Sequence, residues 1–233
     1  MKGKSKPRLA GDRETSRRLL DAAERLFGEH EYNGVGMRML AEEAKVNLGA
    51  ATYHFGSKEA LYVETFLRRF RPANAQRLRL LREADAQAHG KPLPVEIIVG
   101  CMIRPPYLQG LQHPDFLALL ARSLFMPPPF LHQVIHSEME PNMRAFIAAL
   151  RRSLPQIPEN LVFLRTLFSM GALLMFSVQM GKMRHARNPR FHESLLKEMI
   201  RFIAAGLQSN PAVPAKDLPH IPRPGANRRA LEP

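Results

Sequence analysis

The stretch "AKVNLGAATYHFGSKEAL", residues 44–61, decides the fold and is unusual for a globular core. Asn47 is a good N-cap, so the pattern predicts a short helix over 48–55, which Gly56 ends. Ser57 can then cap a further helix. One side of the predicted short helix is poor in bulk, while its end carries neighbouring aromatic and basic side chains. A segment this small cannot bury all of them, so we expect part of it to face a partner.

Two further helices are expected on the N-terminal side of this stretch. Apolar residues recur at helical spacing from about residue 13 to 30 and again from Met37 to Ala44. The turn residues of "YNGVG", 32–36, separate the two segments. A short helix, a tight connection and a second short helix form the sequence shape of a helix-turn-helix.

Helical patterns also dominate the rest of the chain, and no strand alternation is found. Pro72 is expected to kink or divide the long helix that begins after Ser57. The stretches "RPPY" (104–107) and "EP" (140–141) are expected to interrupt later helices. The predicted fold class is therefore all-α, with an N-terminal three-helix helix-turn-helix DNA-binding domain and a larger helical domain.

Changes in composition divide the chain into four segments. We expect a flexible basic arm over 1–12, a helix-turn-helix domain over 13–60, a larger helical domain over 61–208 and a Pro-rich disordered tail over 209–233. The arm has two interpretations, a solubilising tail or a segment that contacts phosphates.

The bulk composition favours a soluble protein with an anionic partner. The 233 residues carry a net charge of +13 and a sequence pI near 10.6, which favours nucleic acid, an anionic membrane surface or an acidic metabolite. The single cysteine, Cys101, excludes an intrachain disulfide and a multi-cysteine zinc site. The longest apolar run, 170–180, is too short to span a membrane, and the basic N-terminus lacks the apolar segment of a secretory signal. We expect a cytoplasmic protein with no membrane partner.

No cofactor and no metal site are expected. His132 and His136 lie one helical turn apart, and Glu140 follows a turn later, a spacing that metal ligands use on one helix face. Surface or pocket-lining histidines are the favoured interpretation. The chain also lacks a recognisable nucleophile–base pair and a Gly-rich phosphate loop after a strand.

Residues of about 13–70 resemble the DNA-binding domain of the TetR family of bacterial transcriptional regulators. The similarity runs through "LLDAAERLFGEHEYNGVGMRMLAEEAKVN" into "YHFGSKEAL". The form "VN…YHFGSKEAL" looks most like the branch that includes fatty-acid-responsive regulators. The sequence departs from the family pattern at Gly36, where Ser or Thr usually caps the second helix, at Lys45, where a turn glycine is usual, and at Thr52, where many members have Tyr.

The predicted helix over 48–55 suits a major groove about 12 Å wide, because its small exposed residues let the backbone approach. Thr52 can reach a base edge or a phosphate, and Tyr53 and His54 can reach flanking phosphates. Lys58 lies at a helix start, whose free N–H groups favour an anion. The positions expected to contact DNA, which match those of the family, are Arg38, Asn47, Leu48, Gly49, Ala50, Thr52, Tyr53, His54 and Lys58. Leu48 remains open between the inner face and DNA, whereas Phe55 is assigned to the core.

The resemblance implies that the larger helical domain binds an effector and dimerises. Met suits a pocket for flexible apolar ligands, and the candidates are Met102, Phe116, Leu120, Phe125, Met126, Phe130, Ile135, Met139 and Met143. Core packing is the alternative role for each of them. An acyl compound is one possible ligand, with Arg104 or Arg122 near an anionic head group.

Two helices from each subunit could form a four-helix dimer interface. The helices expected over about 159–183 and 190–208 carry wide apolar faces. The candidate contacts are Leu164, Phe168, Gly171, Met175, Leu195, Met199 and Phe202. The alternative is that these faces only fill the core of one chain.

The favoured function is a TetR-like ligand-responsive transcriptional regulator, most simply a repressor and not an enzyme. A homodimer would bind a near-palindromic double-stranded DNA operator, and a small hydrophobic effector would release it. A sequence-nonspecific basic DNA-binding protein is the first alternative, and an enzyme on an apolar anionic substrate is the second. The ratio of specific to nonspecific binding separates the first two.

Overall fold

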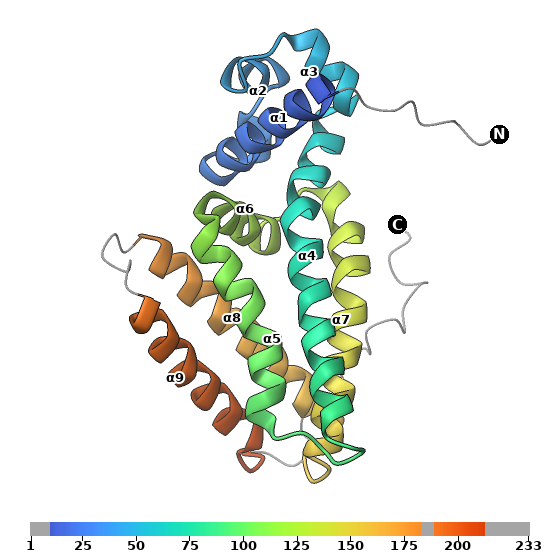
Figure 1. The fold of residues 1–233 in the computed structure, drawn as a ribbon, viewed down its shortest axis with the longest axis vertical. Helices are drawn as coiled ribbons and strands as arrows, with labels where there is room; N and C mark the ends of the chain where they lie inside the picture. The colour runs from blue at the N-terminus through green and yellow to red at the C-terminus, as the bar shows by residue number, and fades with distance from the viewer. Residues whose placement is uncertain (1–9, 183–188, 213–233) are drawn as a thin grey trace, which may run out of the picture. The chain divides into compact units, whose positions relative to one another are not determined.

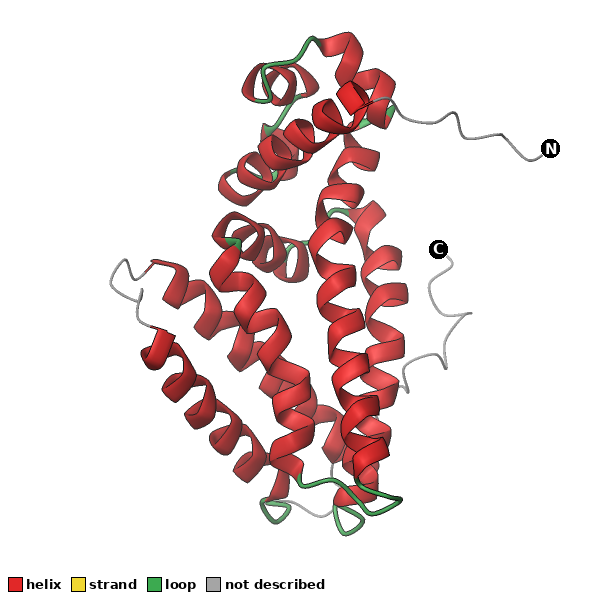
Figure 2. Cartoon of the chain, in the orientation of Figure 1, coloured by secondary structure: helices red, strands yellow, loops and turns green. Residues whose placement is uncertain are grey.

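The computed structural model describes residues 10–182 and 189–212 of the chain. These residues form nine α-helices and two short 3-10 turns and contain no strand, so the predicted all-α class is confirmed (Figures 1 and 2). The elements are α1 (Ala10–Glu29), η1 (Tyr32–Gly34), α2 (Met37–Glu43), α3 (Leu48–Phe55), α4 (Lys58–Gln87), α5 (Val95–Gln112), α6 (Pro114–Phe125), η2 (Pro129–Leu131), α7 (His132–Ser153), α8 (Glu159–Lys182) and α9 (Pro189–Gln208). Most of the predicted arm, 1–12, and of the predicted tail, 209–233, lies outside the described residues.

The helices belong to two packed units. The first unit combines the chain up to Phe70 with His113–Val134, and the second combines Arg71–Gln112 with the chain from Ile135 onward. Both α4 and α7 contribute residues to each unit. The domain boundaries expected from composition stay a prediction.

Small side chains hold α2 and α3 against α1 in the first unit. Leu19 of α1 is fully buried among Ala41 and Ala44, at the end of α2, and Ala51 of α3. Alanine keeps helix propensity high and lets helices approach closely. The apolar spacing that predicted these helices therefore corresponds to a buried alanine-rich contact.

Helix α6 also packs on α1 in the first unit, and the closest approach is at Gly28. A Cβ atom added to Gly28 would lie 2.8 Å from the backbone oxygen of Asp115, which is closer than real Cβ contacts allow. Arg122 of α6 secures the same end of α1, because its Nε donates to the Gly28 carbonyl (3.0 Å) and its Nη2 to the Glu29 carbonyl (3.0 Å). A cationic donor at a helix C-terminus satisfies carbonyls that the helix leaves free.

An ion-pair network links α1 with α4 in the first unit. Glu24 is buried, and its carboxylate accepts from both Arg68 and Arg69. Arg68 also donates to Asp21 (2.7 Å). The buried carboxylate is therefore paired, as burial of a charge requires.

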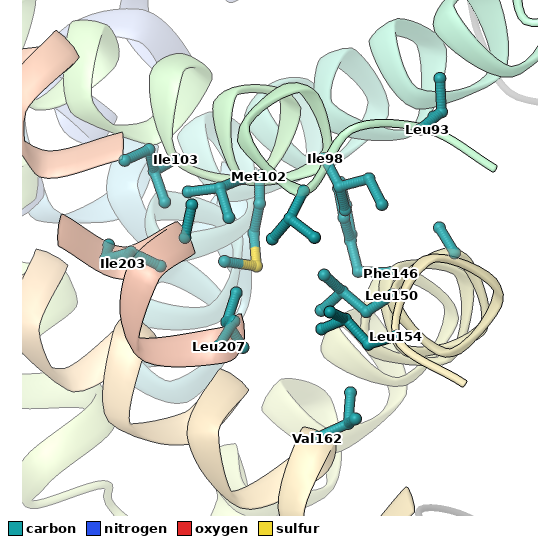
Figure 3. Close-up of a cluster of buried hydrophobic side chains, with 14 of the residues drawn as sticks. Leu93, Ile98, Met102, Ile103, Phe146, Leu150, Leu154, Val162, Ile203 and Leu207 are labelled. Carbon is teal, nitrogen blue, oxygen red and sulfur yellow. The ribbon is translucent and has the colours of Figure 1, made fainter. Parts of the chain in front are cut away.

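The second unit is built around a continuous apolar core. Side chains of α5, α7 and α9, including Ile98, Phe146 and Leu207, point toward one another, with Val162 of α8 beside them (Figure 3). Met102 lies at the centre of this group and is 1% exposed. Helix α5 is the element that packs on both α8 and α9.

The sequence pattern predicted breaks at "RPPY" and "EP" and a kink or division at Pro72, but none of these prolines divides its helix. Pro72 lies inside α4, Pro105 and Pro106 lie inside α5, and Pro141 lies inside α7. A proline inside a helix costs about 3 kcal/mol through a lost hydrogen bond and a clash. In α5, buried residues such as Tyr107 flank the prolines, so the burial of apolar surface on both sides outweighs this local cost.

Replacing Gly28 with alanine tests the close approach of α1 and α6. The added methyl meets the Asp115 backbone oxygen, so we expect Gly28→Ala to lower the free energy of unfolding by about 1–3 kcal/mol despite the better helix propensity of alanine. Gly11→Ala in the same helix is the matched control, because nothing lies within 4 Å of its added Cβ. Chemical denaturation followed by circular dichroism measures both. Equal stability of the two variants would contradict the close contact.

Candidate functional site

Helix α3 begins and ends at the residues that the sequence predicted. The Asn47 side chain accepts a hydrogen bond from the Ala50 N–H (2.6 Å). Gly56 has a φ of 73°, a left-handed conformation that glycine adopts without strain. The Ser57 hydroxyl then accepts from the Ala60 N–H (3.1 Å) in the first turn of α4. Local capping therefore determines both ends of the short helix.

One face of α3 is exposed. Ala51 is fully buried, and Phe55 packs against the same cluster while remaining half-buried. Tyr53 is 76% exposed and Leu48 is 42% exposed, and the small Gly49 is exposed beside them. Leu48 therefore does not belong to the buried inner face of α3, and its side chain is available to contact DNA or solvent.

The remaining candidate DNA-contact residues differ in their exposure and in their hydrogen bonds. Arg38 of α2 and Thr52 are exposed, while Ala50 and His54 are half-buried. The Thr52 hydroxyl donates to the Leu48 carbonyl (3.1 Å), a bond within the helix that leaves its lone pairs available as acceptors. The structure therefore groups the residues of α3 on one exposed surface, with Arg38 on the preceding helix.

Lys58 is positioned by a residue that sequence reasoning missed. Its Nζ donates to the Tyr32 carbonyl (3.1 Å) and lies 4.0 Å from the centroid of the Tyr32 ring. This combination of a hydrogen bond and a cation–π contact fixes the ammonium group near the start of α4. An ammonium carries three donors, so the bond to Tyr32 leaves two. Tyr32 is the first residue of the turn "YNGVG", and the sequence pattern predicted only a turn at this position, not a contact with Lys58.

The turn between α2 and α3 places a lysine in the left-handed region. Lys45 has a φ of 54°, where a residue with a side chain is strained. Arg18 of α1 donates to the Lys45 carbonyl (2.7 Å) and so holds the turn against the first helix. The departure from glycine noted in the sequence therefore falls at a position that glycine would occupy without strain.

The candidate pocket residues are divided between the two units. Phe116, Leu120, Phe125, Met126 and Phe130 belong to the first unit, and Met102, Ile135, Met139 and Met143 belong to the second. In the first unit, Phe125 and Met126 are 60% and 76% exposed and line an open pocket of about 410 Å³ with the aromatic residues of η1 and η2.

The methionine candidates of the second unit adjoin a small cavity. Met102, Met139 and Met143 line it together with Arg77 of α4. Arg77 is 6% exposed, and sequence reasoning missed it. Helical spacing contained the signal, because Arg77 lies four residues from each of the buried residues Ala73 and Leu81.

The arginines expected near an anionic head group have other partners. Arg104 donates to both carboxylate oxygens of Glu193 at 3.0 Å. Arg122 donates to the last carbonyls of α1, as described above. Both guanidinium groups are therefore engaged within the structure, unlike the Nε of Arg77, which has no hydrogen-bond partner.

The candidate dimer residues differ in exposure. Phe168 and Met175 of α8 are 63% and 51% exposed, and Phe202 of α9 is 72% exposed. Gly171 is exposed between the two α8 side chains. The other three, Leu164, Leu195 and Met199, are half-buried, and Leu164 and Met199 pack against the apolar core.

Among the residues that the structure describes, one helix is long and apolar enough to cross a membrane by length and composition alone. It is the window Glu159–Phe176 of α8, with a mean hydropathy of 1.3 and 28% of its residues buried. Arg165 inside this window donates to the carbonyls of Leu207 (2.9 Å) and Ser209 (2.8 Å). This window is longer than the apolar run judged from the sequence, and Leu167, Phe168 and Met175 within it are exposed.

No group of three His, Cys, Asp or Glu side chains in the described part of the chain could hold a metal ion. His132 contacts the Pro129 carbonyl through Nδ1 (3.1 Å), and Glu140 pairs with Arg144. Burial raises the pKa of the Cys101 thiol, which favours the unreactive protonated form.

Comparisons with known proteins cover both parts of the chain. Residues 19–65 match the model described as bacterial regulatory proteins, tetR family, and residues 101–206 match the tetracyclin repressor-like C-terminal domain. The chain is 43% identical over 56 residues to the HTH-type transcriptional repressor AcnR of Corynebacterium glutamicum and 40% identical over 55 residues to AcnR of Corynebacterium efficiens. These alignments cover 23% of this chain and only 30% and 29% of the two relatives.

Solved structures share the fold over most of the chain. HlyIIR, a hemolysin II transcriptional regulator, has a TM-score of 0.59 at 19% identity, covering 85% of this chain and 99% of the other. The fatty acid degradation regulator FadR from Bacillus halodurans has a TM-score of 0.56 at 15% identity, covering 82% and 98%. At these identities the likeness concerns the fold alone.

Replacing Lys45 with glycine tests the strain in the turn before α3. Glycine adopts a φ of 54° without a Cβ penalty, so we expect Lys45→Gly to raise the free energy of unfolding by about 0.5–1 kcal/mol. Lys91→Gly, in another exposed loop, is the control and should be neutral or destabilising. Urea denaturation measures both variants. A loss of stability in Lys45→Gly would show that the lysine side chain stabilises the turn by more than its strain costs.

Proposed function

This chain belongs to the TetR family of bacterial transcriptional regulators, and we propose that it is a repressor that binds a near-palindromic operator as a homodimer and is released by a small apolar effector. Because the family consists of transcription regulators, the protein is a regulator and not an enzyme. We place the protein in the cytoplasm, where the operator would be.

The observation that carries the DNA-binding proposal is the exposed face of α3. A recognition helix needs small residues toward the groove and longer polar side chains beside it. Gly49 and the half-buried Ala50 supply the first, and Tyr53, with Lys58 at the start of the next helix, supplies the second. Helix α3 is held to α1 by buried alanines, so its exposed face is presented rigidly.

The proposed dimer uses the apolar faces of α8 and α9. Exposed aromatic residues on two neighbouring helices are costly in water and suit a buried interface. Phe168 and Phe202 are the most exposed large apolar side chains of these helices. A two-fold dimer carries two copies of α3, one for each half of a near-palindromic operator.

Repression is supported by the relatives, and one of the structural neighbours suggests an effector class. The similar AcnR proteins are transcriptional repressors, and FadR is a fatty acid degradation regulator, so an apolar acyl compound is one effector class for this chain. Helix α4 begins at the DNA-contact residue Lys58 and continues into the second unit. An effector that shifts α4 would change operator affinity, and the operator would weaken the effector by the same factor.

A sequence-nonspecific DNA-coating protein remains the second candidate, because the net charge of +13 alone attracts any duplex. Titration of labelled duplexes from the DNA upstream of its own gene, at fixed salt, separates the two. Binding that is at least about a thousandfold tighter to one upstream duplex than to a shuffled duplex supports the repressor. A ratio near one overturns it.

Substitutions on α3 should separate backbone contact from base reading. We expect Tyr53→Ala to weaken binding to all duplexes equally by about 1–3 kcal/mol, because phosphate contacts carry no sequence information. Thr52→Ala should instead change the order of preference among operator variants. Phe125→Ala is the control, since Phe125 is similarly exposed but lies on α6. An equal loss on every duplex for Thr52→Ala would reduce its role to phosphate contact.

The proposed dimer interface can be tested with a charge. Phe202→Glu would bury a carboxylate in the interface, so we expect dimer affinity to fall by about 2 kcal/mol or more, roughly 30-fold. Light scattering after size exclusion measures the mass across a dilution series. Phe125→Glu is the matched control, at 60% exposure against 72%. A dimer that resists Phe202→Glu and Phe168→Glu alike would place the interface elsewhere.

A further inference from the structure

Arg77 is a buried cation in the second unit without an anionic partner. Its Nη1 donates to the Asn74 side-chain oxygen (3.1 Å), and its Nη2 lies 3.2 Å from the sulfur of Met170. The guanidinium carbon lies 5.7 Å from the centroid of the Phe146 ring. Among the described residues, no carboxylate forms an ion pair with it. Buried arginines are normally paired, so this arrangement calls for an explanation.

Two polar atoms at this place lack a hydrogen-bond partner. They are the Nε of Arg77, a donor, and the Oδ1 of Asn142, an acceptor. Both residues line the same cavity. A buried group without a partner loses its hydration without compensation. Arg77 Nε therefore favours an acceptor such as a carboxylate oxygen, and Asn142 Oδ1 favours a donor such as a water molecule.

The guanidinium remains charged despite its surroundings. Burial lowers the pKa of Arg77 to about 10, because the low-dielectric interior disfavours the charged form. At neutral pH the group is still protonated, since the pH lies well below that value. The second unit therefore holds an uncompensated positive charge in its interior.

The cavity beside Arg77 is small and lined by adaptable side chains. Its volume is about 10 Å³, which is room for about one water molecule. Four of its eight lining residues are methionines, and Thr166 and Phe146 complete much of the wall. Methionine side chains are unbranched and change conformation easily, so this wall can rearrange around an apolar ligand.

We propose that Arg77 anchors the anionic head group of the effector, and that this effector is an organic carboxylate with an apolar body lying among the methionines. The proposal rests on the proposed function, because it assigns a chemical class and a binding residue to the effector. A carboxylate matches the guanidinium fork and neutralises its single charge. A doubly charged phosphate would leave a net negative charge buried, because no second cation lines the cavity.

A single buried water that bonds both unsatisfied atoms is the competing explanation. It would need neither an anion nor an apolar body. The two explanations differ in their response to small carboxylates, so thermal unfolding of the full-length dimer without DNA separates them.

The probes are octanoate and dodecanoate, with 1-octanol as the neutral equivalent and inorganic phosphate as the anion without an apolar body. At about a hundredfold excess over the dissociation constant, we expect a carboxylate to raise the Tm by about 5–10 °C. The alcohol and phosphate should give little shift. Equal Tm shifts from octanoate and 1-octanol, or no shift from either carboxylate, would contradict the proposal that Arg77 binds a carboxylate. The buried water would then be the remaining explanation.

The variant Arg77→Met removes the charge and keeps an apolar side chain of similar length. We expect the ligand-free protein to be as stable or more stable, since the buried unpaired charge is gone. Carboxylate affinity should fall by about 10- to 100-fold, as measured by calorimetry. Arg82→Met, at an exposed position of the same helix, changes the net charge equally and should leave the affinity unchanged.

Two further variants cover the case in which Arg77→Met does not fold. Arg77→Lys keeps the charge without the fork and should bind carboxylate with intermediate affinity. Asn142→Leu removes the unsatisfied acceptor and should leave carboxylate selectivity over 1-octanol in place. Unchanged affinity in Arg77→Lys and Arg77→Met would overturn the anchor. If a carboxylate binds through Arg77 but leaves operator affinity unchanged, the effector role in the proposed function fails instead.

Discussion

The absence of bulk between the first three helices is the constraint on which the proposed DNA-contact surface depends. Ala41, Ala44 and Ala51 surround Leu19, and no larger side chain could occupy these positions without moving α3 away from α1. Helix α3 has only about two turns, and its exposed residues lie away from the buried Ala51. Their direction is therefore set by the inner face, and the outer face is free to carry small and polar side chains. The strained turn at Lys45 is tolerated because that packing, together with the bond from Arg18, holds it.

The parts of the fold that local chemistry determines could be predicted from the sequence. The bounds of α3 follow from Asn47 and Gly56, whose capping roles depend on neighbouring residues only. The helices around Pro72, Pro105 and Pro141 could not, because their continuity depends on tertiary burial on both sides of each proline. Local rules give the cost of a proline but not the packing that offsets it.

In the candidate site, too, local sequence patterns predict some features, while others depend on tertiary contacts. The exposed set on α3 follows from helical periodicity, since Ala51 and Phe55 share one face. The contact between Lys58 and Tyr32 joins positions 26 residues apart, which no local pattern encodes. The effector candidates were chosen for composition, and composition carries no information on which unit a residue joins. Helix α6 packs on α1 through Gly28, so its aromatic residues belong to the first unit and not to the cavity beside Arg77.

The buried cation gives the proposed coupling a physical origin. A ligand shifts a conformational equilibrium only by its difference in affinity for the two states. Arg77 and Lys58 lie on the same helix, α4, 19 residues apart in sequence. A carboxylate that satisfies Arg77 removes an electrostatic cost that is present only in the ligand-free protein, so it favours whichever position of α4 best places that side chain. If this position differs from the one that presents Lys58 to DNA, operator affinity must fall, and by reciprocity the operator must weaken the carboxylate. An apolar ligand without the charge would lack this term, which makes the head group the source of the regulatory energy.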